Sequence, residues 1–296
     1  MKKISLFAIT CCFCLFTTAF VIAQTDTTSY GQNAGTNGDR NSNFGYTAGN
    51  TQTTAGDDNT YVGSRAARLA FGDFNTSAGA YSAYYMQSGS RNSFLGTTAG
   101  FRNISGNDNL YMGFAAGYSN EKSNNVMIGD GAGSNNNGTR NVFIGHTAGA
   151  NESGNDKLYI DNSNTATPLI YGDFSTKKVG INTNKLINQL GSADLSAYSL
   201  YVKGGILTEE VHVQTGWADY VFEKDYHLLS IEKVADFIEK NGHLPNIPSA
   251  KAVETDGIEL GDITKRQQEK IEEIMLYVIE IQKEIDTINR ELETNK

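Results

Sequence analysis

The apolar and polar positions of the chain repeat from Asn41 to Gly149. Seven units align, each with a glycine four residues after its first asparagine, at a spacing of 16 to 18 residues. The best-formed units follow the pattern N-x-φ-φ-G-x-x-A-G, where φ is apolar, as in Asn92–Gly100 and Asn141–Gly149. A fixed short period is the signature of a repeat architecture. The units begin at Asn41, Asn59, Asn75, Asn92, Asn109, Asn125 and Asn141.

Each unit predicts one short strand between tight turns, because its apolar run is bounded by Gly, Asn, Asp and Ser. Gly and Asn tolerate the positive φ angles of narrow corners, and equivalent asparagines can hydrogen-bond the turn of the neighbouring unit. A degenerate eighth unit, Lys157–Asp161, predicts an exit cap. The fold class expected is mainly β: a parallel β-roll or solenoid over residues 24–161.

Two adjacent apolar residues in each unit predict two faces, since successive side chains of a strand point to opposite sides. One face can line a thin core. The other then forms an exposed apolar stripe, which marks an interface. We expect the core and a seam between chains to be formed by Phe94, Leu95, Tyr111, Met112, Met127, Ile128, Phe143 and Ile144.

Residues 162–262 predict two smaller regions. In residues 162–214, short strands are expected at Leu169–Phe174, Val179–Asn182, Leu200–Ile206 and Val211–Val213, with residues 185–199 as a linker. Residues 215–262 are expected to form a small α+β module.

That module contains one amphipathic helix with clear ends. Ser230 is expected to cap its N-terminus, Glu232 lies in its first turn, and Gly242 ends it. Leu244–Pro248 follows as a stiff turn with two of the chain's three prolines.

Residues 263–296 carry heptads that predict a trimeric coiled coil. Isoleucine at both a and d favours trimers or tetramers over dimers. The alternative is one amphipathic helix packed on a globular domain, because Met275–Ile279 is largely apolar all round. The a positions are Ile271, Val278, Ile285 and Leu292, and the d positions are Ile274, Ile281 and Ile288.

The N-terminus predicts export. Lys2 and Lys3 precede an apolar run that ends in Val21-Ile22-Ala23, which is typical of a signal peptide over residues 1–23, with an uncleaved membrane anchor as the alternative. All three cysteines lie in this segment. The mature chain therefore has no disulfide and needs backbone pairing or oligomerisation for stability.

Charge argues against a nucleic-acid partner. The net charge is −9 and becomes −11 without the signal peptide. Residues 24–184 hold 12 acids and 10 bases, whereas the remainder holds 21 acids and 12 bases. Two different kinds of structure are expected to follow one another.

The N-x-φ-φ-G-x-x-A-G units resemble the head repeats of trimeric autotransporter adhesins and related tail-fibre-like proteins. The resemblance covers about Asn41–Asp161 and implies left-handed parallel β-rolls, three per trimer.

Trp217–Phe222, His243–Pro245 and the heptads resemble the C-terminal region of tail-fibre proteins related to endosialidase-type intramolecular chaperones. Self-cleaving members use a serine followed by aspartate, with a lysine soon after. Here Ala218 precedes Asp219, and Lys224 has no serine nucleophile to activate. No catalytic residue is therefore expected.

Metal and ligand chemistry is sparse in the sequence. The histidines His146, His212, His227 and His243 lack ligand spacing, so no metal or cofactor is expected. Calcium at the turn acids Asp57-Asp58, Asn107-Asp108 and Asn155-Asp156 is an alternative without a matching motif. The Ser- and Asn-rich runs 123–125 and 134–138 fit polar turns or glycan contacts.

These patterns predict a secreted, homotrimeric, fibre-like surface protein in adhesion, structure or display, and no enzyme. Its expected partners are two further copies of the chain and a host or environmental glycan or surface ligand, with no nucleic acid and no membrane span after signal cleavage. The alternative is a fibre-borne glycan-binding or glycan-cleaving protein with a chaperone-like C-terminal domain. Cleavage would need paired carboxylates, and the repeats hold few acids outside turns.

Overall fold

The computed structural model describes residues 27–51 and 55–294. The expected signal peptide and its cysteines lie outside the described residues. The chain divides into a solenoid unit, up to residue 186 plus 198–205, and a C-terminal unit, 187–197 plus 206 onward.

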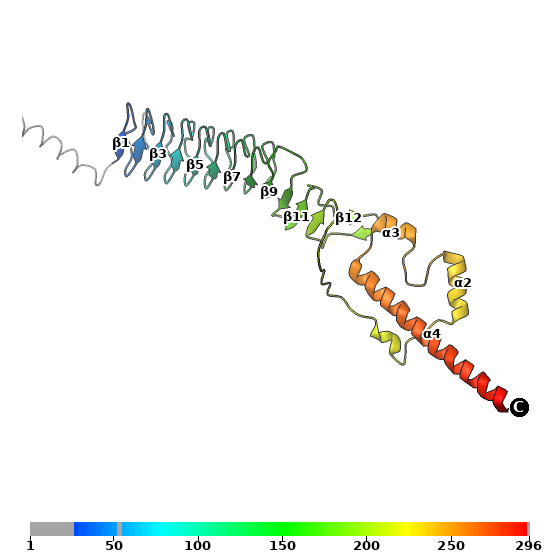
Figure 1. Ribbon diagram of the computed structural model, residues 1–296. Coiled ribbons are helices and arrows are strands. Elements are labelled where there is room, and N and C mark those ends of the chain that lie inside the picture. The colour runs from blue at the N-terminus through cyan, green and yellow to red at the C-terminus, as the bar shows by residue number, and fades with distance from the viewer. Residues whose placement is uncertain (1–26, 52–54, 295–296) are drawn as a thin grey trace, which may run out of the picture. The chain divides into compact units, whose positions relative to one another are not determined.

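The solenoid unit is built on one twelve-stranded sheet whose strand order follows the chain (Figure 1). Strands β1 to β9 pair in parallel, each with the next, and form a solenoid of about eight turns. This confirms the parallel repeat fold that the asparagine and glycine spacing predicts. The strands are β1 (Thr28–Tyr30), β2 (Ser42–Phe44), β3 (Thr60–Val62), β4 (Thr76–Ala78), β5 (Ser93–Leu95), β6 (Leu110–Met112), β7 (Val126–Ile128), β8 (Val142–Ile144) and β9 (Lys157–Ile160).

The solenoid core is one side chain thick at each strand. The register places equivalent residues side by side, so that Phe94 lies opposite Tyr111 and Tyr111 opposite Met127. A second buried row comes from the eighth position of each unit, which is alanine in all but one of the seven units and Ser82 in the other. The first row is Asn43, Tyr61, Ser77, Phe94, Tyr111, Met127, Phe143 and Tyr159, and the second includes Ala48, Ala66, Ala99, Ala116, Ala132 and Ala148.

Strand β1 adds a turn before the first unit that the asparagine spacing identifies. It pairs with β2 from Thr28↔Ser42 to Tyr30↔Phe44. Gly31–Gly35 reads G-x-x-A-G, the second half of the repeat, but Thr27 stands where later units have asparagine. The asparagine spacing therefore does not predict this turn.

After β9 the sheet changes direction. Strands β10 (Ile170–Asp173) and β11 (Lys178–Ile181) are antiparallel, and β14 (Leu200–Val202) pairs parallel with β11. The expected strand at Leu200–Ile206 is shorter than predicted, and Val211–Val213 is not a strand. Residues 203–206 and 211–213 have no strand partner.

The C-terminal unit is mostly helical. It contains the 3-10 helix η2 (Asp219–Phe222), α2 (Ile231–Asn241), α3 (Ala250–Asp256) and α4 (Leu260–Thr294). The α+β content expected of residues 215–262 is not confirmed, because their described elements are all helical. The strands of this unit, β12 (Gln189–Leu190) and β13 (Ala193–Asp194), lie in the expected linker.

Helix α2 has the ends that its sequence predicts. The Ser230 side chain accepts a hydrogen bond from the Lys233 backbone N–H, and Gly242 adopts a left-handed φ of 74°. Within the described part of the chain, no helix combines the length and apolarity needed to cross a membrane.

Candidate functional site: exposed stripes and an aromatic face

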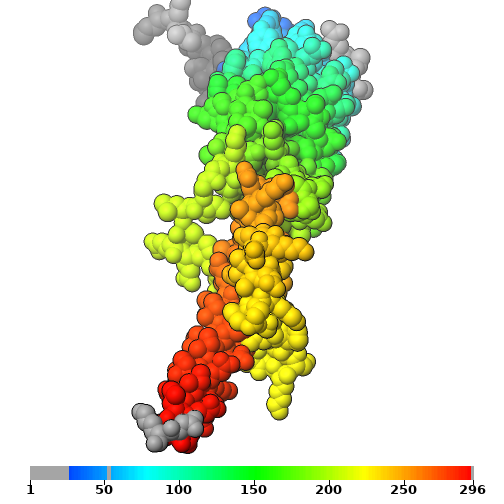
Figure 2. All heavy atoms as spheres, turned by 90° about the vertical axis from the view of Figure 1, so that its right-hand side faces the viewer, coloured from blue at the N-terminus to red at the C-terminus, as the bar shows by residue number. Residues whose placement is uncertain are grey.

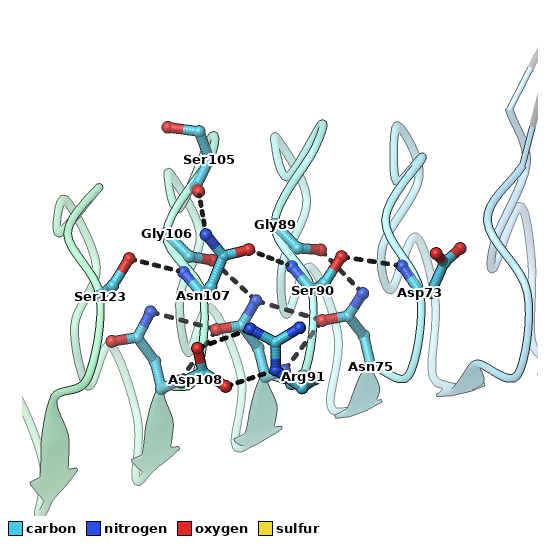
Figure 3. Close-up of polar contacts among 12 residues, drawn as sticks. Asp73, Asn75, Gly89, Ser90, Arg91, Ser105, Gly106, Asn107, Asp108 and Ser123 are labelled. Atoms are coloured by element: carbon cyan, nitrogen blue, oxygen red, sulfur yellow. Dashed lines mark hydrogen bonds and ion pairs between the residues drawn. The ribbon is translucent and has the colours of Figure 1, made fainter.

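An asparagine ladder fixes the stacking of the solenoid turns (Figure 3). The Asn92 backbone N–H donates to Asn75 Oδ1 at 2.9 Å, and the Asn109 backbone N–H donates to Asn92 Oδ1 at 3.0 Å. Asn92 Nδ2 donates to the Gly106 carbonyl at 2.8 Å. These side chains are buried, so each satisfies backbone groups that water cannot reach. The neighbouring-turn role predicted for the asparagines is confirmed.

A second, outer ladder uses the residues two places before the asparagines. The Ser90 backbone N–H donates to Asn107 Oδ1 at 2.8 Å, and Asp73 N–H donates to Ser90 Oγ at 3.1 Å (Figure 3). Beside it, Arg91 forms a bidentate ion pair with Asp108. This hydrogen-bonded pair lowers the pKa of Asp108.

The turn acids that suggested calcium are engaged by protein groups. Asp58, Asp108 and Asp156 pair with Arg40, Arg91 and Arg140 at 2.6 Å. Over residues 27–51 and 55–294, no group of three or more His, Cys, Asp or Glu side chains is placed to hold a metal ion.

The outward residues of the solenoid strands form an apolar stripe. Phe94, Tyr111, Met127 and Phe143 are buried, whereas Leu95 is 50% exposed and Met112 40% exposed. We call the outward row the strand stripe. It consists of Phe44, Val62, Leu95, Met112, Ile128 and Ile144, with Leu110, Val126 and Val142 partly exposed beside it.

Helix α4 carries the second apolar stripe. Figure 2 shows its C-terminal part, in red, uncovered on the face in view. We call the a and d row the helix seam. All of its residues are exposed in the single chain: Ile271, Ile274, Val278, Ile281, Ile285, Ile288 and Leu292.

A polar cluster buries the middle of α4 against η2 and the turn before α3. Lys270 Nζ lies 2.8 Å from Glu269 and 2.7 Å from Glu273, and Tyr220 donates to Glu269. Asn246 Nδ2 also donates to Glu269, at 3.1 Å. We call these five residues the α4 anchor.

The α4 anchor shifts the pKa values of Glu269 and Tyr220. Burial alone would raise the pKa of Glu269, but hydrogen bonds from Lys270, Tyr220 and Asn246 outweigh it and lower the pKa to about 2. The hydrogen bond to Glu269, aided by burial, raises the pKa of Tyr220 to about 12. The carboxylate is therefore held ionised against burial.

An aromatic face that the repeat motif does not predict lies on the loop side of the solenoid. The rings of Tyr84 and Phe101 stack at a centroid distance of 5.5 Å, and those of Phe101 and Tyr118 at 4.8 Å. Tyr85 packs edge-on against Tyr84 and Phe101 at 4.7 and 5.1 Å. The signal in the sequence is an aromatic residue at the tenth position of three successive units.

Two arginines extend the aromatic face toward the N-terminus. Arg68 lies over the Tyr84 ring at 5.7 Å and donates to its hydroxyl at 2.6 Å. Arg65 lies over the Tyr81 ring at 5.2 Å and donates to its hydroxyl. Guanidinium groups stack favourably on aromatic rings.

The start of η2 has no serine nucleophile. Ala218 is fully buried at the start of η2, and Asp219 is the first residue of that helix. Alanine has no group that could attack a peptide bond.

No family model, curated protein or solved structure matches this chain.

Proposed function

We propose that the chain is a secreted, homotrimeric, fibre-like surface protein that serves adhesion or display. The observation that carries this proposal is the pair of apolar rows, the strand stripe and the helix seam, that the single chain leaves exposed. Contiguous exposed apolar surface marks an interface. Both rows fit further copies of the same chain.

The helix seam favours three chains. Its a and d positions are isoleucine, valine and leucine over residues 271–292, and isoleucine at both positions favours trimers or tetramers. α4 is one continuous helix through this range. Three such helices would bury the seam in a parallel coiled coil, and three chains is also the number that the resemblance of the repeats to adhesin heads implies.

The solenoid suits display because the residues that stack its turns recur while its surface varies. The buried asparagines and alanines recur from turn to turn, so stacking does not depend on the outward residues. Position six, for example, carries Tyr46, Thr97, Phe114, Asp130 and His146 in different units. A fixed scaffold with variable loops is a common basis for recognition. No enzymatic role is proposed.

The test is the solution mass of residues 24–296 by light scattering. Three times the mass of one chain is the result expected, and a single-chain mass would overturn the trimer. Replacing Leu95 in the strand stripe by Glu is expected to lower the melting temperature more than the same change at Thr97, which is exposed but outside the stripe. Equal effects would remove the stripe from the interface.

A further inference from the structure

The aromatic face differs chemically from the two apolar stripes. The strand stripe and helix seam are mainly aliphatic, whereas this face combines tyrosine hydroxyls, ring edges and guanidinium groups. Tyr85 is 42% exposed, and Tyr84, Phe101 and Tyr118 are partly exposed. Aliphatic surfaces favour association of chains, while aromatic rings with polar tips favour contacts that are half apolar and half hydrogen-bonded.

The guanidinium groups of this face keep hydrogen-bonding capacity. Arg65 and Arg68 each donate through one terminal nitrogen to a tyrosine hydroxyl, and a guanidinium has five N–H donors. Arg102 occupies the position of Tyr85 one turn later, since the Tyr85 N–H donates to the Phe101 carbonyl and the Arg102 N–H to the Tyr118 carbonyl. It is exposed, and its side chain has no hydrogen bond or ion pair to any residue that the structure describes. These three arginines lie in the repeat region although the chain as a whole has a net charge of −9.

We propose that the aromatic face binds a polysaccharide that carries carboxylated sugars. Arginine forks match carboxylates in bidentate geometry, and an exposed tyrosine ring can pack against the apolar face of a sugar. The row Arg68, Tyr84, Phe101 and Tyr118 follows four successive turns, so a linear glycan can contact several turns at once. The positive charge on this face favours an acidic glycan over a neutral one.

This inference rests on the proposed function, because it names the ligand class that the adhesion role would use. It does not depend on the helix seam or on the strand stripe. The residues involved lie within the solenoid unit, on loop positions rather than on the outward strand positions.

Isothermal titration calorimetry on residues 24–296 tests the proposal, with a polygalacturonate oligosaccharide as probe and a neutral maltooligosaccharide of equal length beside it. The acidic probe is expected to bind and the neutral probe to bind at least about tenfold more weakly. Equal binding of the two, or no binding of the acidic probe, would overturn the proposal.

Four variants locate the site. Arg102→Gln and Tyr85→Ala are expected to weaken polygalacturonate binding about tenfold. Two control variants are expected to leave polygalacturonate binding unchanged. Arg91→Gln removes an exposed arginine that pairs with Asp108, and Phe114→Ala removes an exposed ring outside the aromatic face. Unchanged binding in both Arg102→Gln and Tyr85→Ala would exclude this face.

Light scattering on the same samples tests the trimer separately from the glycan ligand. A trimer that ignores the acidic glycan overturns the ligand class and leaves the trimeric fibre intact. A monomer that binds it overturns the trimer and retains the aromatic face as the binding site.

Discussion

At the ninth position of the seven units that begin at Asn41 to Asn141, the backbone is left-handed and the residue is glycine or alanine. Gly117 has a φ of +57°, and a Cβ there would lie 2.5 Å from the Tyr111 ring. Ala83 occupies the same position with a φ of 51°, in a unit whose strand centre is the small Ser77. Ala67 has the same conformation, with a φ of 48°, in a unit whose strand centre is the large Tyr61. Glycine is therefore needed at position 117 because of where the Tyr111 ring lies, and not because of strand-centre size alone.

Gly117→Ala is expected to destabilise the solenoid by roughly 2–4 kcal/mol, since it adds left-handed strain and an overpacked core. Ala83→Gly is the matched control at the equivalent position. It relieves the strain of a left-handed alanine and loses a buried methyl group, and these effects oppose each other. The free energy of unfolding is therefore expected to change by no more than about 1 kcal/mol. Urea unfolding followed by circular dichroism measures both. Equal losses would show that the clash with the Tyr111 ring does not matter.

The buried asparagine ladder gives a second prediction at this scale. Asn92→Ala leaves the Asn109 backbone N–H and the Gly106 carbonyl without these partners, and each buried orphan costs about 1–3 kcal/mol. A loss of roughly 2–4 kcal/mol in unfolding free energy is therefore expected. Asn137→Ala is the control, because Asn137 is exposed and lies outside the ladder. Similar losses in both variants would contradict the ladder's role.

At the level of elements, the sequence predicts the strands that recur with the repeat and the helix that has clear caps. β2 to β9 follow from the unit spacing, and α2 follows from Ser230 and Gly242. β1 is missed because it lacks the initial asparagine, and the β12–β13 hairpin because four paired residues leave too little pattern. Short elements without a period depend on contacts distant in sequence.

Helix α4 has one feature that the sequence predicts and one that it does not. The seam residues lie exposed on it, as the heptads require. The burial of Glu269 and Lys270 could not be predicted, because such residues are almost never buried unless paired. Their partners Tyr220 and Asn246 lie 49 and 23 residues away from Glu269.

The α4 anchor predicts a pH dependence. The pKa of Glu269 is lowered from 4.5 to about 2 in the folded chain, so the unfolded state binds the proton more readily. Its stabilisation is fully present above pH 4.5 and is lost as the pH falls toward 2. Glu269→Gln is expected to flatten this part of the stability curve, measured by thermal unfolding from pH 2 to 6. The control Glu291→Gln, at an exposed position of α4, keeps the slope; an unchanged slope in Glu269→Gln would contradict the assignment.

At the scale of the whole molecule, the candidate surfaces differ in how far the sequence predicts them. The strand stripe follows from alternation along each strand, which predicts two apolar faces but not which of Leu95 and Phe94 points outward. The aromatic face requires Arg68, Tyr84, Phe101 and Tyr118, spaced over 50 residues, to meet on successive turns. Only the stacking of the turns brings these side chains into one row.

Chain number is the last property to test, and two positions on α4 offer a matched pair. Ile285 is an a residue of the helix seam and is 45% exposed in the single chain, and Ile279 lies at b and is 46% exposed. In a coiled coil, Ile285→Asp places three carboxylates at the buried axis, where charge is costly. Ile279→Asp places them on the outer surface.

Ile285→Asp is therefore expected to give single chains or aggregates, as deletion of residues 263–296 would, while Ile279→Asp remains trimeric. Both changes introduce the same residue into the same helix, so their intrinsic effect on helix stability is equal. Parallel pairing of long β segments from separate chains is slow unless the chains are already held together. Loss of the seam should therefore also slow refolding of the solenoid, measured by circular dichroism after dilution from urea. If Ile285→Asp stays trimeric and refolds at the normal rate, the helix seam does not set the number of chains.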